Sequence, residues 1–366
     1  MSKVNNRIKA ELLCWYQENQ RVLPWRGSKD AYKIWLSEVI MQQTRVAQGT
    51  PYYLKFVEKY PTVLSLAAAD EHEVLILWQG LGYYSRGRNL LKAARQVMTD
   101  FNGVFPQDYK DVIKLKGVGP YTAAAIVSIA FDKPHAVLDG NVFRVLSRIY
   151  GIETPINAPG AREIFQDYAD KLLDKKNPGT FNEAMMEFGA TLCLPNNPLC
   201  ESCPVAKNCF AKKNNLQNVL PVKLALKKVK TRYLHYLFVN KDGQFVIRHR
   251  KPGDIWQGLY ELPLVETRQE EILNLKKAAD ETGLKFSFLK PLKKMTHKLT
   301  HQRLEIMFYE ADLISAINNE TILTDAIGYK HYPLPKPLEL FLKDYLCTPV
   351  RTAAVSRPGG LEIPEF

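Results

Sequence analysis

The chain has 366 residues, which predicts two domains at about 100–200 residues per domain. Hydrophobic residues make up 46% of it and charged residues 24%, a globular composition that excludes a wholly disordered or fibrous chain. The 50 Lys and Arg exceed the 38 Asp and Glu by 12, and this positive charge suits a polyanionic partner such as nucleic acid or an anionic membrane. The membrane is disfavoured, because the longest apolar stretch, around residues 123–131, is far shorter than the roughly 20 residues of a spanning helix. The first residues also lack the apolar core of a signal peptide.

The first half of the chain has a helical pattern. Apolar residues recur at three- and four-residue spacing from about residue 8 to residue 188, and glycine-rich turns separate the segments. We therefore predict an all-α first domain. The predicted helices are Arg7–Gln17, Ile34–Val46, Glu73–Leu77, Asn89–Met98, Tyr121–Phe131, Val142–Ile149, Ala161–Leu173 and Phe181–Leu192.

A basic stretch separates this half from a region with a different pattern. Between Pro204 and Arg232 the chain has eight Lys and Arg and no acid, which is typical of a linker. The segments that follow predict an α+β domain, with strands at Tyr233–Val239, Gln244–His249 and Leu304–Ala311, a hairpin turn at Lys241-Asp242-Gly243 and a helix at Glu270–Thr282. The predicted boundaries are 1–215 for the helical domain, 216–232 for the linker, 233–347 for the second domain and 348–366 for a disordered tail.

Four cysteines are clustered at the end of the helical half. Cys193, Cys200, Cys203 and Cys209 follow a C-x6-C-x2-C-x5-C spacing within 17 residues. Four thiolates can hold a tetrahedral zinc ion or a cubane iron–sulfur cluster, and the residues alone leave both open. Two disulfides are the disfavoured alternative in a chain without a secretion signal. Either metal group would be structural, since protein ligands fill all four positions.

A Gly-Val-Gly hairpin links two of the predicted helices. Gly117, Val118 and Gly119 permit a tight turn, and Pro120 suits the first position of the next helix. Backbone N–H groups at that helix start can bind a phosphate, with Lys116 adding positive charge. An ordinary helix–helix turn is the alternative. Beside the positive charge of the chain, the motif predicts a helix-hairpin-helix that holds the DNA backbone independently of sequence.

Two acids lie in otherwise apolar surroundings. Glu38 lies in the most apolar helix of the first half, where burial would favour its protonated form. A solvent-facing position on an amphipathic helix is the alternative. Asp139 comes just before a helix, where it is either an ordinary N-cap or a carboxylate that the helix start keeps ionised. One protonated and one ionised acid is the arrangement that cleaves glycosidic bonds.

These motifs together resemble the helix-hairpin-helix DNA glycosylases of the endonuclease III superfamily. Three further segments resemble the adenine DNA glycosylases of the MutY type, and the resemblance extends from about residue 8 to residue 346. These segments are Leu23–Arg26, Ser37–Thr44 and Gly80–Arg86. The resemblance implies a [4Fe-4S] cluster on the four cysteines and removal of adenine mispaired with 8-oxoguanine or guanine. It also implies double-stranded DNA as the partner, a monomeric protein, and a cytoplasmic location that is nucleoid-associated in a bacterium.

The resemblance assigns roles to single residues. Glu38 protonates adenine, Asp139 stabilises the oxocarbenium-like sugar, and Tyr121 and Asn141 position Asp139 and water. Tyr121 stands where bifunctional relatives carry a lysine that forms a Schiff base, and a phenol cannot form that imine. The chain is therefore expected to be monofunctional and to leave an abasic site. Of the substrate-binding residues, Gln43 wedges into the base stack, Thr44, Leu81 and Tyr83 support lesion recognition, and Trp25, Arg26 and Glu183 line the adenine pocket. Core packing is the alternative for Trp25 and Tyr83.

The second domain resembles a Nudix-type fold. The run Trp256–Pro263 matches the segment that precedes the Nudix box, but Lys276 and Lys277 stand where magnesium-binding hydrolases need acids. Diphosphate hydrolysis is therefore disfavoured. In the resembling family this domain reads 8-oxoguanine through a Phe-Ser-His loop, and this chain has Leu299-Thr300-His301 instead. Thr300 keeps a hydroxyl for a hydrogen bond to a base edge, and His301 is either part of the loop's contact or an ordinary surface residue.

Three other functions compete with this one. A thymine/guanine mismatch glycosylase also carries tyrosine at the position of Tyr121 but lacks the second domain. A non-catalytic, zinc-dependent DNA-binding protein would use the same four cysteines. A Nudix hydrolase with an added helical domain is disfavoured by Lys276 and Lys277.

Overall fold

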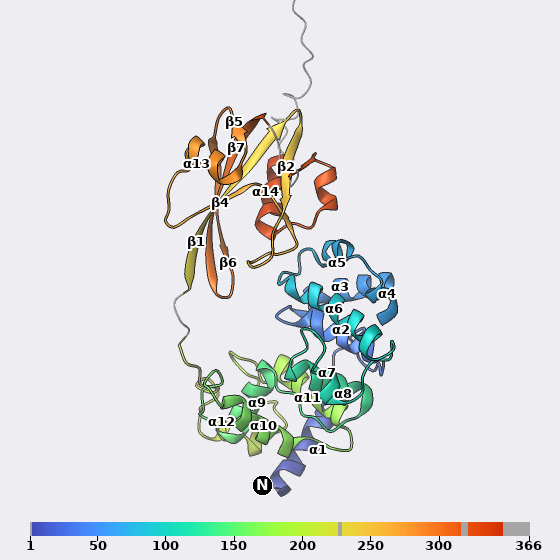
Figure 1. Ribbon diagram of the computed structural model, residues 1–366. Coiled ribbons are helices and arrows are strands. Elements are labelled where there is room, and N and C mark those ends of the chain that lie inside the picture. Colours follow the sequence, from blue (N-terminus) through green and yellow to red (C-terminus); the bar gives the residue numbers. More distant parts are fainter. Residues whose placement is uncertain (1, 226–228, 316–320, 347–366) are drawn as a thin grey trace, which may run out of the picture. The chain divides into compact units, whose positions relative to one another are not determined.

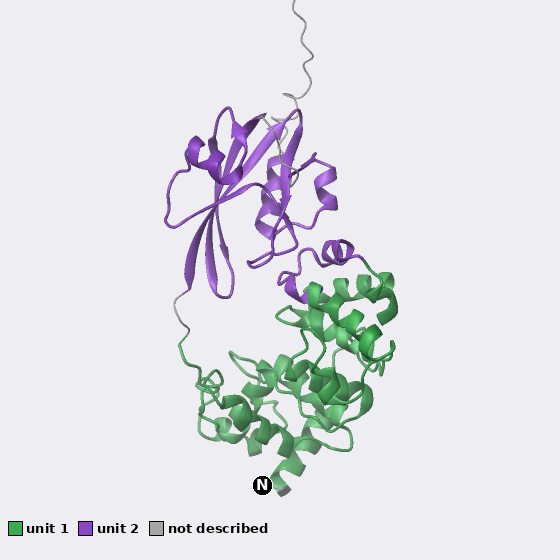
Figure 2. Ribbon diagram, in the orientation of Figure 1, with its two compact units in different colours: residues 1–69, 88–226 green, residues 70–87, 227–366 purple. Residues whose placement is uncertain are grey.

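The computed structural model describes residues 2–225, 229–315 and 321–346. It divides into two compact units, 1–69 with 88–226 and 70–87 with 227–366 (Figure 2). Across the described residues, none of the helices combines the length and apolar character needed to cross a membrane. The predicted tail at 348–366 lies outside the described residues.

The first unit is helical throughout its described residues, as the apolar spacing predicts (Figure 1). Its last helices surround the cysteine loop, which contains a short 3-10 turn, Ala206–Asn208. The chain passes through α1 (Ser2–Asn19), α2 (Ala31–Met41), α3 (Val46–Lys59), α4 (Val63–Ala67), α6 (Ser85–Asp100), α7 (Tyr109–Val112), α8 (Pro120–Phe131), α9 (Gly140–Tyr150), α10 (Ala161–Leu172), α11 (Pro178–Thr191) and α12 (Phe210–Lys213). Helix α5 (Glu71–Trp78) and the first residues of α6 belong to the second unit.

The single helix predicted over Ile34–Val46 is wrong. Helix α2 ends at Met41, and α3 begins at Val46 after a turn in which Gln43 has a φ of 54°. The turn brings α3 back against α2 at Gly49, where a Cβ would lie 2.6 Å from the Met41 sulfur. The apolar spacing continues through this turn, so periodicity alone could not reveal it.

The second unit contains an eight-stranded mixed sheet. The predicted hairpin is confirmed, since β1 pairs antiparallel with β2 through Asn240 and Phe245. On its other edge β1 pairs in parallel with β7. Strand β7 also pairs antiparallel with β6, and the two form a hairpin. The strands are β1 (Lys230–Lys241), β2 (Gln244–His249), β3 (Tyr260–Glu261), β4 (Leu264–Thr267), β5 (Lys285–Phe286), β6 (Lys290–Lys298), β7 (Gln302–Ser315) and β8 (Thr321–Thr324).

Side chains of β1 alternate between two cores. Tyr236 and Phe238 pack in a cluster with Phe341 of helix α14 (Lys336–Leu346). Leu237 packs in a second cluster with Ala278 of helix α13 (Leu275–Thr282). The two faces of the sheet are therefore covered by different helices, which confirms the predicted α+β class.

The basic stretch, predicted as a linker without acids, differs from this prediction in two ways. Strand β1 begins at Lys230, inside the segment predicted as linker. Arg232 is buried and paired with Asp254 and Glu266, and Lys212 is paired with Glu201. These acids lie outside the stretch itself, so its own composition could not indicate them.

Candidate active site

Glu38 is held in the middle of α2. Asp30 caps this helix by accepting hydrogen bonds from the backbone of Tyr32 and Lys33, and the helix is buried on most of its surface. The residue as a whole is partly accessible, but its carboxyl group is enclosed by protein. Burial, aided by the negative charges of Asp139 and Glu183, raises the pKa of Glu38 to about 7, although a hydrogen bond from Tyr121 lowers it.

Asp139 is both an N-cap and a buried acid. Its Oδ1 accepts a hydrogen bond from the Val142 N–H at 2.7 Å, and its Oδ2 accepts one from Asn141 Nδ2 at 2.8 Å. The pKa of Asp139 is raised, because burial outweighs these two bonds and the positive charge of Arg144. The sequence suggested that the helix start keeps Asp139 ionised. In the structure the helix start does not lower this pKa below its usual value. Asp139 still has more groups that favour its ionised form than Glu38 has.

Tyr121 connects the two acids. It lies in the first turn of α8, directly after Pro120. Its hydroxyl lies 3.2 Å from Met186 Sδ and also takes part in the hydrogen bond with Glu38. Burial and the charges of Glu38 and Asp139 raise the pKa of the phenol well above its usual value, so it stays protonated. The structure thus brings Glu38, Tyr121, Asp139 and Asn141 together, although they come from three helices.

Arg144 supports this group and was missed by sequence reasoning. It is buried, one turn along α9 from Gly140, and its Nη2 donates to Asn141 Oδ1 at 2.8 Å and to the Gly189 carbonyl at 2.7 Å. Its Nε donates to the Cys193 carbonyl at 2.8 Å. The position of Arg144 three residues after Asn141 on one helix face was the available signal.

The residues predicted for the adenine pocket lie around a second group of charges. Arg26 Nη2 donates to Glu187 Oε2 at 3.0 Å, and Arg26 Nε lies 3.8 Å from Glu183 Oε1. Tyr16 donates to Glu183 Oε2 at 3.4 Å. Glu187, which is almost fully buried, was not predicted, although it lies one helical turn after Glu183 on α11.

Trp25, the chain neighbour of Arg26, was also predicted for the adenine pocket. It is partly exposed, and its ring makes an edge contact with Tyr53 at a centroid distance of 5.1 Å. Complete core packing is therefore not its role. Tyr16, Arg26 and Glu183 line one open pocket of the first unit.

The predicted recognition residues are found on two turns. In the α2–α3 turn Gln43 is exposed with left-handed backbone geometry, and the neighbouring Gln42 donates to Thr122 Oγ1 at 3.2 Å. Thr44 donates to the Gln42 carbonyl at 3.2 Å, so this turn is tied both to itself and to α8. Such anchoring leaves the Gln43 side chain outside the packed core.

The second turn lies in the other unit. Leu81 is buried, whereas Tyr83 is 48% exposed, which is contrary to core packing. Within this unit the Tyr83 hydroxyl lies 2.5 Å from Thr300 Oγ1. Thr300 and His301 are both exposed, and Leu299 packs against the hydrophobic core. Leu299 therefore takes a supporting position beneath the loop.

The hairpin at residues 116–119 combines a left-handed glycine with a helix start that no side chain caps. Gly117 has a φ of 78°, and the Lys116 N–H donates to Gln96 Oε1 at 2.7 Å. No side chain caps helix α8 at Gly119, so its first backbone N–H groups can meet a phosphate. Val118 is buried beneath the turn, and Lys116 is exposed.

The four predicted cysteine ligands surround one cavity. All four are free thiols, which contradicts the disulfide alternative. Buried Arg148 donates a hydrogen bond to Cys193 Sγ at 3.3 Å. Among the described residues, no three His, Cys, Asp or Glu side chains group as ligands of one metal ion. The four cysteines line one cavity, and four thiols are the donor set of either a tetrahedral zinc ion or an iron–sulfur cluster.

Comparison with known proteins agrees with this geometry. Residues 36–171 match the family model of the HhH-GPD superfamily base excision DNA repair proteins, and residues 235–344 match that of the NUDIX domain. The chain is 30% identical over 340 residues to an adenine DNA glycosylase of Buchnera aphidicola subsp. Acyrthosiphon pisum, covering 91% of this chain and 96% of that protein. It is 43% identical over 222 residues to an adenine DNA glycosylase of Homo sapiens, covering 58% of this chain and 41% of that protein.

Solved structures resemble the first part of the chain. A thermostable thymine-DNA glycosylase aligns with a TM-score of 0.54 and 29% identity, covering 58% of this chain and 98% of its own. Endonuclease III in a non-covalent DNA complex aligns with a TM-score of 0.51 and 23% identity, covering 59% and 99%, which establishes the fold alone.

Proposed function

Because the chain belongs to the family of adenine DNA glycosylases, within the helix-hairpin-helix superfamily of base excision DNA repair proteins, we propose that its substrate is adenine opposite 8-oxoguanine or guanine in double-stranded DNA. One observation carries the mechanism: a Glu38 carboxyl whose pKa is raised to about 7 lies within electrostatic reach of Asp139. A carboxyl group protonated near neutral pH can donate a proton, and a neighbouring carboxylate can stabilise a developing cation.

The reaction begins with extrusion of the adenosine, because its glycosidic bond cannot be reached inside the base stack. Gln43, exposed on its anchored turn, fills the space that the base leaves. Arg26 and Glu183, which line the open pocket of the first unit, hold the extruded base there. Trp25, next to Arg26 in the chain, is proposed to contact the same base.

Glu38 donates its proton to N7 of adenine, which makes the base a better leaving group. The bonding pair of the C1′–N9 bond leaves with the base, and positive charge develops on the sugar. Ionised Asp139, held by Asn141 and the Val142 N–H, stabilises this charge. Glu38, now a carboxylate, accepts a proton from the water that attacks C1′, and Tyr121 helps to position Asp139 and that water.

The product is an intact strand with an abasic site. Strand cleavage by this superfamily needs an amine that forms an imine with the sugar, and Tyr121 offers a phenol that stays protonated. One copy of the chain is proposed to act on one duplex. Its proposed location is the cytoplasm, with the nucleoid if the source is a bacterium.

The cysteine cavity is proposed to hold a [4Fe-4S] cluster, bound through Cys193, Cys200, Cys203 and Cys209. When bound, it would supply cross-linking of the loop that carries Lys207 rather than reaction chemistry. Zinc is the alternative for the same thiols. Metal analysis of the purified protein would separate them, with about four iron atoms per chain expected and stoichiometric zinc contradicting the proposal.

A thymine/guanine mismatch glycosylase is the second candidate, because a thymine-DNA glycosylase aligns with the first part of the chain. It is disfavoured by the NUDIX match at 235–344 and by adenine glycosylase relatives that align across 91% of the chain.

The catalytic assignment is tested with Glu38→Gln and Asp139→Asn in single-turnover assays on duplex DNA with adenine opposite 8-oxoguanine. Each variant should lose roughly 10²–10⁴-fold in rate, the usual contribution of a positioned acid or base. Thr99→Val, which removes only exposed hydrogen bonds on α6, is the control and should keep the rate. Activity near that of the unmodified protein in either catalytic variant would remove that residue from the mechanism.

A further inference from the structure

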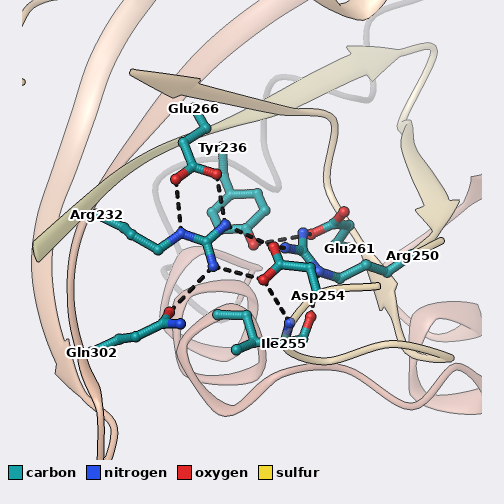
Figure 3. A network of polar contacts seen from close by, with 8 residues as sticks. All are labelled: Arg232, Tyr236, Arg250, Asp254, Ile255, Glu261, Glu266 and Gln302. Atoms are coloured by element: carbon teal, nitrogen blue, oxygen red, sulfur yellow. Dashed lines mark hydrogen bonds and ion pairs between the residues drawn. The ribbon is translucent and has the colours of Figure 1, made fainter. Parts of the chain in front are cut away.

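Arg232 lies at the centre of a network of polar contacts in the second unit (Figure 3). It is a buried residue near the start of β1. A guanidinium group has five N–H donors. Arg232 uses five hydrogen bonds: two to Asp254, at 2.7 Å each, two to Glu266, at 2.7 and 2.6 Å, and one to Gln302 Oε1, at 3.2 Å.

The acids of this network are themselves fixed. Asp254 also accepts from Arg250 Nη2 at 2.6 Å and from the Ile255 N–H at 2.7 Å. Arg250 in turn donates to Glu261, which accepts a further bond from the buried Tyr236 hydroxyl at 3.0 Å. The orientation of Arg232 is thus set by groups on several segments of the unit. Because the guanidinium is planar, it also restricts the orientation of the side chains that accept its hydrogen bonds.

Gln302 connects this network to an exposed loop. It is the residue directly after Leu299-Thr300-His301, the connection between β6 and β7. Its carbonyl accepts a hydrogen bond from the Leu299 N–H at 2.8 Å, which closes the loop, while its side chain is held by Arg232. The backbone and the side chain of one residue therefore join the loop to the fixed network.

We infer that Arg232 is a positioning residue which, through Gln302, sets the placement of Thr300 and His301 and so the discrimination between 8-oxoguanine and guanine opposite adenine. This inference rests on the proposed substrate and on these two residues reading the opposite base. Hydrogen bonds discriminate between bases only when donors and acceptors are held within about 0.5 Å of their productive positions. Gln302, held by Arg232 and directly following the loop, is suited to that requirement. Neither Gln302 nor Arg232 takes part in the bond-breaking chemistry.

The test uses the full-length protein with Gln302→Met and Arg232→Lys. The first removes the acceptor at similar size, and the second keeps the charge but loses the planar fork. Thr296→Val is the matched control, because it removes a hydrogen bond of 2.8 Å to Glu305 across the same hairpin without touching the network. Thr300→Ala reports whether the loop reads the opposite base at all.

Binding is measured on duplexes with a non-cleavable adenosine analogue opposite 8-oxoguanine or guanine, with single-turnover rates opposite guanine measured beside it. Gln302→Met and Arg232→Lys should each lower the affinity ratio between the two duplexes by about threefold to tenfold, as loss of one hydrogen-bond anchor would. In these two variants the single-turnover rate opposite guanine should stay unchanged. In Thr296→Val the affinity ratio should stay unchanged.

The outcomes are distinguishable. An unchanged ratio in Gln302→Met, with a lowered ratio in Thr300→Ala, overturns the inference and leaves the reading role standing. A lowered ratio in Gln302→Met but not in Arg232→Lys also overturns it, since Gln302 would then act directly. If Thr300→Ala itself leaves the ratio unchanged, the reading role fails and the inference fails with it. Should Arg232→Lys not fold, Glu266→Gln, which weakens the hold on Arg232 at an exposed position without touching Gln302, takes its place with the same expected result.

Discussion

Single residues carry the chemistry, and Glu38 gives it a pH dependence. Burial raises the pKa of Glu38 to about 7, and the protonated form is the acid that the mechanism uses. The single-turnover rate should therefore be high below pH 7 and fall about tenfold for each further unit of pH above it. The low-pH side should be set by Asp139, whose pKa burial also raises, because its protonated form cannot stabilise a cation.

A pH–rate profile on adenine opposite 8-oxoguanine measures this dependence. Glu38→Gln is the control, since its residual rate should lose the fall near pH 7 and become flat there. A profile with no change in slope between pH 6 and 8 in the unmodified protein would contradict the role of Glu38 as the acid.

At the scale of residues, the sequence offered candidates that the structure brings together, such as Glu38 and Asp139, but it could not predict their surroundings. The apolar run around Glu38 left it open whether the side chain was buried, because α2 is apolar on most of its surface and shows no clear polar face. Asp139 was left as either an N-cap or a catalytic acid, and its two carboxylate oxygens allow both. Arg144 and Glu187 were missed although each lies one helical turn from a predicted residue, because their other partners come from distant parts of the chain.

Elements position these residues, and the hairpin before α8 offers a matched pair of tests. Gly117 has a φ of 78°, and a Cβ there would lie 2.8 Å from Asn89 Cβ. Gly119 has a φ of −97°, and a Cβ there would meet nothing within 4 Å. Gly117→Ala should therefore lower the free energy of unfolding by about 1–3 kcal/mol and weaken DNA binding, whereas Gly119→Ala should change the free energy of unfolding little.

Denaturant unfolding and binding to undamaged duplex measure the two effects. Equal behaviour of the two variants would show that left-handed geometry at Gly117 is not what shapes the turn. Among the elements, the long amphipathic helices and the β1–β2 hairpin followed from periodicity and turn chemistry. The α2–α3 break and the short strands did not, since they depend on tertiary packing such as that of Gly49 on Met41.

The whole molecule carries a net charge of +12, and its effect on DNA binding depends on which cations remain available. Arg232 and Lys212 are paired with acids, whereas Lys116 is exposed on the hairpin. Lys116→Gln should weaken binding to any duplex and reduce the slope of log affinity against log salt by about one. Arg7→Gln, at an exposed residue paired with Glu11 on α1, is the control and should leave the slope unchanged. A slope unaffected by Lys116→Gln would exclude a phosphate contact there.

At the scale of the whole molecule the sequence predicted two parts of different fold class. It could not predict which residues belong to each part. Residues 70–87 pack with the second unit although helices of the first unit flank them in the chain. Such grouping depends on contacts far apart in sequence, for example the Tyr84 hydroxyl donating to the Leu334 carbonyl at 3.1 Å. The predicted boundaries at 215 and 233 remain predictions.

We propose that the protein hydrolyses the glycosidic bond of mispaired adenine and stops at the abasic site. This proposal is tested most directly by incubating the protein with duplexes that place adenine opposite 8-oxoguanine, guanine or thymine, and thymine opposite guanine, with and without subsequent alkali. We expect adenine release opposite 8-oxoguanine and guanine, with strand breaks appearing only after alkali. Thymine release from the guanine mispair in preference to adenine, or strand breaks without alkali, would contradict it.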